Sequence, residues 1–137
     1  MKIGIIGSMH FTEKMIAVRD ELIQRGHDAF VSSLAAPFVG KTDEEKEVIK
    51  LDQKNNSDAI REFWRLMQGA DAVLVMNVDR YGIQHYIGGN TLMEIGFAHV
   101  LHQKIFLYHP IPDMPYCQSE IAAVKPIIIN EDLSLIV

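Results

Sequence analysis

Five short apolar blocks, separated by amphipathic stretches, constrain the fold more than any other feature of this sequence. The blocks run from Lys2 to Ile6, Asp28 to Ser32, Ala72 to Met76, Lys104 to Tyr108 and Pro126 to Ile129. The third and fourth blocks are continuous apolar runs, which is the pattern of strands covered by helices on both faces. The five blocks therefore predict the strands of a parallel sheet.

The stretches between the blocks carry apolar residues at helical spacing, together with signals for the start and end of helices. Thr12 is a candidate cap for a helix that ends at Gly26, and Thr42 with Glu45 has the spacing of a capping box. The helix that follows this box either stops at the polar residues 55–57 or continues through them. Helices and strands thus alternate along the chain.

This alternation is typical of right-handed βαβ units and a parallel sheet. We predict one α/β domain over residues 1–137, a flavodoxin-like or Rossmann-like three-layer sandwich with a five-stranded parallel sheet in the order 2-1-3-4-5. In that architecture the loops after the first, third and fourth strands meet at the topological switch point, where ligands bind.

Composition and charge narrow the functional classes. The chain has 13 basic and 18 acidic residues and a formal charge of −5, which argues against binding to a nucleic-acid polymer but not to a mononucleotide. No apolar run has the length of a membrane span, and no signal-peptide pattern precedes the first block. The single cysteine, Cys117, cannot form an internal disulfide. We therefore expect a cytoplasmic protein without membrane contact.

We expect neither a cofactor nor a metal. Gly4 and Gly7 do not supply the glycine spacing of a dinucleotide fingerprint, and the second block ends in serines rather than in an acidic residue. His99 and His102 lie three residues apart on a predicted helix, but no third ligand has matching spacing. The charge run at residues 43–47 is interpreted as a solvated helix face.

Three loops carry residues suited to ligand binding. After the first block, Gly7 allows close backbone approach, and Ser8 and His10 add polar groups near a helix start that favours anions. An ordinary β-to-α turn is the alternative for this loop. After the third block, Asn77 and Asp79 stand beside a guanidinium and a phenol. They are candidates to read a base edge or to donate a proton, although such loops often only solvate the end of a strand.

The loop before the fourth block is the most informative. Gly88 and Gly89 permit close approach, and Asn90 or Thr91 is predicted to cap a helix whose free amides could cradle a phosphate. Glu94 follows about one turn later, on the face toward the sheet edge if Met93 and Phe97 point to the core. Taken alone, an acid in the first turns of a helix is more often a mild dipole stabiliser than a catalytic group.

Three stretches occur in a recognisable order. They are Ile6-Gly7-Ser8-Met9-His10, then Gly69-Ala70-Asp71 leading into the third block, and then the run from Gly88 through Glu94, Gly96 and Ala98 to Gln103-Lys104. Together they resemble the nucleoside 2-deoxyribosyltransferase superfamily and its relatives, the 2′-deoxynucleoside 5′-phosphate N-hydrolases. The resemblance extends from Met1 to about Tyr108.

The resemblance implies an enzyme that breaks or transfers the N-glycosidic bond of a nucleoside or nucleoside 5′-monophosphate. Glu94 would be the nucleophile and would form a glycosyl-enzyme intermediate. In the N-hydrolases the first loop and the loop before the glutamate hold the 5′-phosphate, which here implies Ser8, His10, Gly88 and Asn90. Sites of this family are commonly completed across a subunit interface, so a homo-oligomer, a dimer or higher, is expected.

Two other functions stay open. This chain departs from the family at Gly4, where relatives often carry an aromatic residue, and at Gly88 and His10, where they often carry aspartate and arginine. A non-catalytic nucleotide-binding module on the same fold would explain these losses, whereas the retained Glu94 favours an enzyme. The third alternative is an interaction domain that binds no small ligand. The apolar residues Phe63, Trp64 and Met67 and the tail 133–137 are candidate contacts with a partner subunit.

Overall fold

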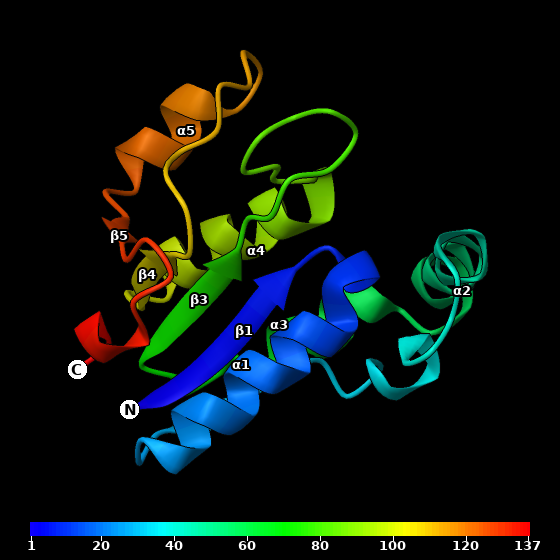
Figure 1. Ribbon diagram of the computed structural model, residues 1–137, viewed down its shortest axis with the longest axis horizontal. Helices are drawn as coiled ribbons and strands as arrows, with labels where there is room; N and C mark the ends of the chain where they lie inside the picture. The colour runs from blue at the N-terminus through cyan, green and yellow to red at the C-terminus, as the bar shows by residue number, and fades with distance from the viewer.

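All five predicted strands form one sheet in the computed structural model, which describes residues 1–137 (Figure 1). The sheet is parallel throughout, and its order β2-β1-β3-β4-β5 confirms the predicted flavodoxin-like topology. The strands are β1 (Lys2–Gly7), β2 (Asp28–Phe30), β3 (Ala72–Met76), β4 (Lys104–Leu107) and β5 (Ile127–Ile128). The two edge strands are shorter than predicted.

Five α-helices and three short 3₁₀ helices connect and cover these strands. The α-helices are α1 (Thr12–Gln24), α2 (Asp43–Asn56), α3 (Ala59–Leu66), α4 (Gly89–Val100) and α5 (Gln118–Ala123). The 3₁₀ helices are η1 (Met9–Phe11), η2 (Ala36–Phe38) and η3 (Leu133–Leu135). None of these helices combines the length and the hydrophobicity that crossing a membrane requires.

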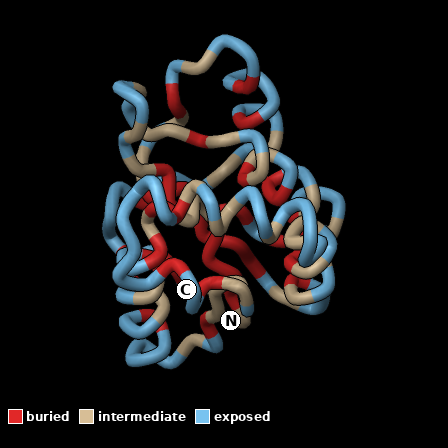
Figure 2. Tube along the Cα trace, turned by 90° about the vertical axis from the view of Figure 1, so that its right-hand side faces the viewer, coloured by how far each residue is buried: buried red, intermediate tan, exposed pale blue.

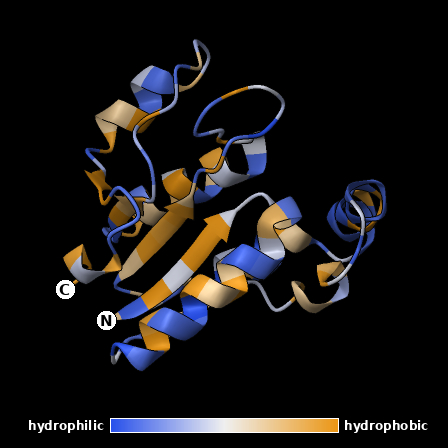
Figure 3. Cartoon of the chain, in the orientation of Figure 1, coloured by the Kyte–Doolittle hydropathy of each residue, from blue (hydrophilic) through white to orange (hydrophobic).

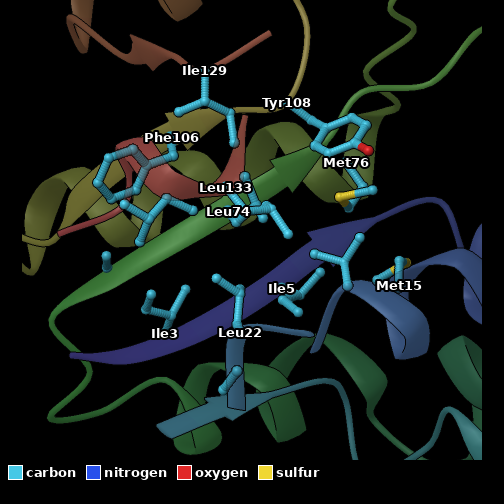
Figure 4. Close-up of a cluster of buried hydrophobic side chains, with 14 residues drawn as sticks. Ile3, Ile5, Met15, Leu22, Leu74, Met76, Phe106, Tyr108, Ile129 and Leu133 are labelled. Atoms are coloured by element: carbon cyan, nitrogen blue, oxygen red, sulfur yellow. The ribbon is translucent and has the colours of Figure 1, made fainter. Parts of the chain in front are cut away.

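The central strands are buried on both faces, so alternate side chains enter two separate cores. Leu74 and Met76 point into one core, against α1 and the C-terminal tail (Figure 4). Val73 and Val75 point into the other core, against α3, α4 and α5. The buried residues therefore lie in the middle of the molecule and the exposed ones outside (Figure 2). This arrangement explains the continuous apolar run of β3.

Several helix boundaries follow the sequence signals. Gly26 has a positive φ of 93° immediately after the C-cap of α1, as expected of a stop signal. The capping box of Thr42 and Glu45 is present at the start of α2. Of the two alternatives for residues 55–57, the chain stops: α2 ends at Asn56, and Asp58 adopts a left-handed conformation before α3 begins.

The start and the buried face of α4 differ from the prediction. The helix begins at Gly89 with Gly88 as N-cap and without a capping side chain, so neither Asn90 nor Thr91 caps it. Met93 is 41% exposed and does not face the core. Its neighbour Glu94 is directed inward instead, because the helix is rotated so that the buried face consists of Thr91, Glu94, Ile95 and Ala98.

Helix α2 is the most hydrophilic helix and lies beside the carboxyl end of β1, away from the two cores (Figures 1 and 3). Its charge run was predicted to be solvated, and this prediction is wrong for Lys46. The Lys46 side chain is buried, and its Nζ donates to the His10 carbonyl at 3.0 Å and to Glu13 Oε2 at 2.7 Å. Polar contacts, rather than an apolar stripe, therefore attach α2 to the body.

The apolar segments that suggested a subunit interface are largely covered within the chain. Phe63 and Met67 belong to the core beneath α3 and α4, and Trp64 packs edge-on against Phe97. In the tail, Leu133 and Ile136 are buried in the core shared with α1. These residues consequently do not require a partner subunit to be shielded from water.

Gly7 is predicted to be irreplaceable at the end of β1, because a side chain there would collide with β3. A Cβ at Gly7 would lie 3.0 Å from the Met76 carbonyl oxygen and 3.2 Å from Met76 Cβ. We expect Gly7→Ala to lower the free energy of unfolding by about 1–3 kcal/mol in urea titrations, as overpacking does. Gly96→Ala is the control: its Cβ meets no atom within 4 Å, and a gain of about 0.5–1 kcal/mol is expected in mid-helix. Equal effects of the two variants would contradict this account.

Candidate functional site

Two adjoining hollows lie at the carboxyl end of the sheet, between α2 and the starts of α1 and α4. The outer cleft has a volume of about 130 Å³ and the inner hollow about 50 Å³. They share the lining residues Gly7, Met9, Gln53, Ala59 and Asn90. Because β1 and β3 are neighbours whose crossovers leave on opposite faces of the sheet, this position is the topological switch point.

The outer cleft is lined by cationic side chains although the protein as a whole is acidic. Lys50 and Lys54 come from α2, and Arg80 comes from the loop between β3 and α4. His10 also lines the cleft, and no Asp or Glu does so. The local charge therefore favours an anionic ligand.

Arg80 is placed for such a ligand by its own neighbours. Its guanidinium lies 4.4 Å above the ring of Tyr81, and Nη2 donates to the Tyr81 hydroxyl at 3.3 Å. Its only carboxylate neighbour, Asp43, is 3.5 Å from Nη1, and its buried Nε has no hydrogen-bond partner. A buried donor without a partner is costly, so the hydrogen bonds within the protein do not fully satisfy the guanidinium beside the cleft.

The start of α4 adds backbone donors to the same cleft. Gly89, Asn90 and Thr91 all line the cleft, and the first backbone bond of the helix runs from Leu92 to the Gly88 carbonyl. Since no side chain caps this end, the first amides are free to bind an anion together with the positive end of the helix dipole. Tyr86 forms an aromatic wall nearby, edge-on to Tyr81 at 5.4 Å between ring centroids.

Glu94 lies in the inner hollow and is the only carboxylate that lines either hollow. It is 6% exposed and makes no hydrogen bond or salt bridge to the protein. Burial raises the pKa of Glu94 from 4.5 to about 8, and the charge of Glu62 adds to this rise while that of Lys54 opposes it. A buried, unpaired carboxyl with a strongly shifted pKa is a frequent mark of a functional site.

Glu62 belongs to the same electrostatic neighbourhood, on the side of the sheet where α3 lies. Ser32 and Ser33, which follow β2, donate their hydroxyls to its carboxylate oxygens. The negative charge of Glu62 disfavours a second negative charge on Glu94. Glu62 therefore adds to the rise in the pKa of Glu94 that burial causes.

The structure brings together most of the residues predicted from the two glycine-containing loops. The residues of this set that line the cleft are Gly7, Ser8, His10, Gly88, Gly89, Asn90 and Thr91. Ser8 also accepts a hydrogen bond from the His10 amide and so begins η1. Both loops leave adjacent strands at the same sheet edge, which is why they meet.

Asn77 and Asp79 were predicted to contact the ligand, but the structure places both outside the two hollows. Asn77 is fully buried: its amide donates to the carbonyls of His109 and Pro110 and accepts from the His109 amide. Asp79 accepts from the backbone of His85. Asn77 thus ties the ends of β3 and β4 together, and Asp79 shapes its own loop.

His10 was predicted to contact the ligand, yet its ring nitrogens point toward α2. Nδ1 lies 3.1 Å from Asp43 Oδ1, and Nε2 lies 2.9 Å from Glu47 Oε2. The imidazole side chain is 3% exposed. Both nitrogens are consequently occupied by carboxylates of one helix face.

The predictions missed the contributions of α2 and of the loop after Asn77. Lys46, Lys50 and Lys54 recur every four residues, a spacing that places three ammonium groups on one face of a helix. This pattern could have indicated a cationic face, but it does not say what that face contacts. Arg80 and Tyr81 stood in a recognised polar loop, and only the fold shows that they, rather than their neighbours, enter the cleft.

Comparisons with protein-family models, with curated proteins and with solved structures found no match to this chain. The inference of function therefore depends on the geometry of the site and on the sequence resemblance described above.

The raised pKa of Glu94 predicts a pH-dependent stability difference between the wild type and Glu94→Gln. Because the folded state holds the Glu94 proton up to about pH 8 and the unfolded state releases it near 4.5, wild-type stability falls between these values. Relative to Glu94→Gln, we expect this loss to be on the order of 3 kcal/mol at pH 7, measured by denaturant unfolding across the pH range. The exposed Glu44→Gln is the control, whose curve should run parallel to that of the wild type. A Glu94→Gln curve parallel to the wild type would contradict the burial argument.

Proposed function

We propose that this protein cleaves or transfers the N-glycosidic bond of a nucleoside 5′-monophosphate, or of the corresponding nucleoside, with Glu94 as the nucleophile. The observation that carries the proposal is the pairing of a buried, unpartnered Glu94 with an adjoining cleft that has only cationic charges. A ligand that spans both hollows needs an anionic group for the outer cleft and a second group that can react with the Glu94 carboxylate. A phosphorylated nucleoside has both.

The orientation of the ligand follows from the two linings. The phosphate lies in the outer cleft with Arg80, Lys50 and Lys54 and with the free amides of α4. The sugar lies over the boundary between the hollows, where C1′ can approach the Glu94 carboxylate. The base also lies in the outer cleft, against Tyr86 rather than against the Tyr81 ring that Arg80 covers, because a flat ring is well suited to an aromatic surface.

The reaction proceeds in two steps. The Glu94 carboxylate attacks C1′, the C1′–N bond breaks, and its electron pair leaves with the base nitrogen, which takes up a proton. Water, or a second base, then attacks C1′ and releases a proton to solvent, and the glycosyl–carboxylate bond breaks to restore the Glu94 carboxylate. Since no other carboxyl group lines the hollows, the departing base takes its proton from solvent through the open cleft.

A non-catalytic nucleotide-binding module remains the second candidate, and two observations favour it. Asp79, the predicted proton donor, lies outside both hollows. In the free protein at neutral pH, burial keeps most of Glu94 in its neutral form, because its pKa is about 8. In such a module, Glu94 would donate a hydrogen bond to the ligand instead of attacking it.

A substrate panel separates the two candidates. We expect base release, followed by chromatography, from at least one member of a panel of ribo- and deoxyribonucleosides and their 5′-monophosphates. Glu94→Ala should reduce this release by at least about 10³-fold, as loss of a nucleophile does, without abolishing binding. The exposed Glu44→Ala should keep full activity. If concentrated wild-type protein releases no base, with or without an acceptor base, but binds the nucleotides, the binding module replaces the enzyme.

The pH profile gives an independent test of the role of Glu94. Only the ionised carboxylate can attack C1′, so kcat/KM should rise about tenfold per pH unit below pH 8 and level off above it. Glu62→Gln removes a charge that raises the pKa of Glu94, and it should therefore move the profile toward lower pH. An unchanged profile in Glu62→Gln would contradict the coupling between the two carboxyl groups.

A further inference from the structure

A chain of alternating charges connects the first loop, α2 and the cationic cleft. Its members in spatial order are Arg80, Asp43, His10, Glu47 and Lys50. The contacts are 3.5 Å between Arg80 and Asp43, 3.1 Å and 2.9 Å from His10 to its two carboxylates, and 2.6 Å between Glu47 and Lys50. Both ends of this chain line the outer cleft, whereas its centre is buried.

The hydrogen-bond geometry at the centre requires a particular protonation state. A neutral imidazole has only one N–H, so it can donate to Asp43 or to Glu47 but not to both. Both carboxylates are held in the ionised form: the hydrogen bond from His10 lowers the pKa of Asp43, and Lys50 and then His10 lower that of Glu47. The two short contacts are therefore satisfied together only by the imidazolium.

The protonation of His10 changes the charge that the cleft presents to a ligand. With the imidazolium, the five-member chain carries one net positive charge. With neutral imidazole the chain is neutral, because Asp43 and Glu47 then balance Arg80 and Lys50. The remaining charged groups around the ring leave this difference unaltered, since Lys46, which donates to the His10 carbonyl, is itself paired with Glu13.

We propose that His10 is a positioning residue that keeps Arg80 and Lys50 available to a phosphate or sulfate group, and that its loss of a proton weakens this anion site. His10 acts through Asp43 and Glu47 and does not touch the ligand. When the ring is neutral, one carboxylate loses its donor and turns to the nearest cation of the cleft. The protonated ring therefore gives a higher anion affinity than the neutral ring, and a rise in pH that removes the ring proton lowers the affinity.

This inference depends on the proposed function only for the identity of the natural ligand, which is a phosphomonoester. The test uses sulfate, whose charge is constant across the range, and the Glu94→Gln background, which removes the titration of Glu94. Binding is measured by calorimetry at low ionic strength between about pH 6 and pH 9. Arg80→Gln in the same background locates the ion, because it should abolish binding in the cleft.

We expect sulfate to bind on the order of fivefold to tenfold more weakly at pH 9 than at pH 6, the effect of removing one charge near a partly exposed site. His10→Gln should bind with the weak affinity at every pH. His10→Lys, which keeps a positive charge throughout, should restore tight binding and abolish the pH dependence. The exposed His99→Gln is the control and should behave as its parent.

Three results would overturn the inference: a sulfate affinity that is independent of pH in the Glu94→Gln protein, a pH dependence that persists in His10→Gln, or sulfate binding that Arg80→Gln leaves intact. The first needs no variant at His10, so the test survives if those variants fail to fold. If the nucleotide panel yields no base but sulfate follows the expected pattern, the proposed reaction fails and the anion site stands. Turnover without a His10-dependent sulfate affinity would refute this inference alone.

Discussion

Both faces of the parallel sheet must be covered, because its crossover connections place helices on either side and its central strands have no polar face. Ala72, Leu74 and Met76 enter one core, and Val73 and Val75 enter the other. Packing on both sides leaves the carboxyl ends of β1 and β3 as the place where the loops separate. The two hollows form there, so the position of the site is a consequence of how the sheet is buried.

The two hollows of the site provide different electrostatic environments for the groups that line them. The inner hollow is surrounded by core residues, and it raises the pKa of Glu94 because a charge in such surroundings is poorly solvated. The outer cleft lies against α2, a helix attached by ion pairs, and remains polar and cationic. A carboxyl with a raised pKa beside a polar, cationic cleft is a combination that neither environment would provide alone. The contrast explains why the proposed ligand has one charged end.

Helix α2 has little apolar contact with the sheet, and its attachment depends on charged side chains. Lys46 bonds to the first loop, and His10 lies between Asp43 and Glu47 of the helix. The helix therefore supplies cationic groups to the cleft through charged contacts, whereas α1 and α4 are attached mainly by apolar packing. The part of the site with the weakest apolar anchoring is also the part that we propose to be regulated.

Local patterns in the sequence determined the fold class. The apolar runs, the stop at Gly26 and the capping box of Thr42 and Glu45 depend on neighbours in the chain, and the structure confirms each of them. The convergence of Gly7, Ser8 and residues 88–91 was predictable for a related reason, because the carboxyl ends of parallel strands share one sheet edge.

Only the tertiary structure decided which side chains enter the cleft. The rotation of α4 about its axis, set by packing, turned Glu94 inward and Met93 outward. Asn77 and Arg80 lie three residues apart in one loop, yet one bonds to the segment that follows β4 and the other lines the cleft. His10 is distant in sequence from Lys50, yet both side chains pair with Glu47. Loop conformation and ion pairing of this kind depend on long-range contacts, so no local pattern specifies them.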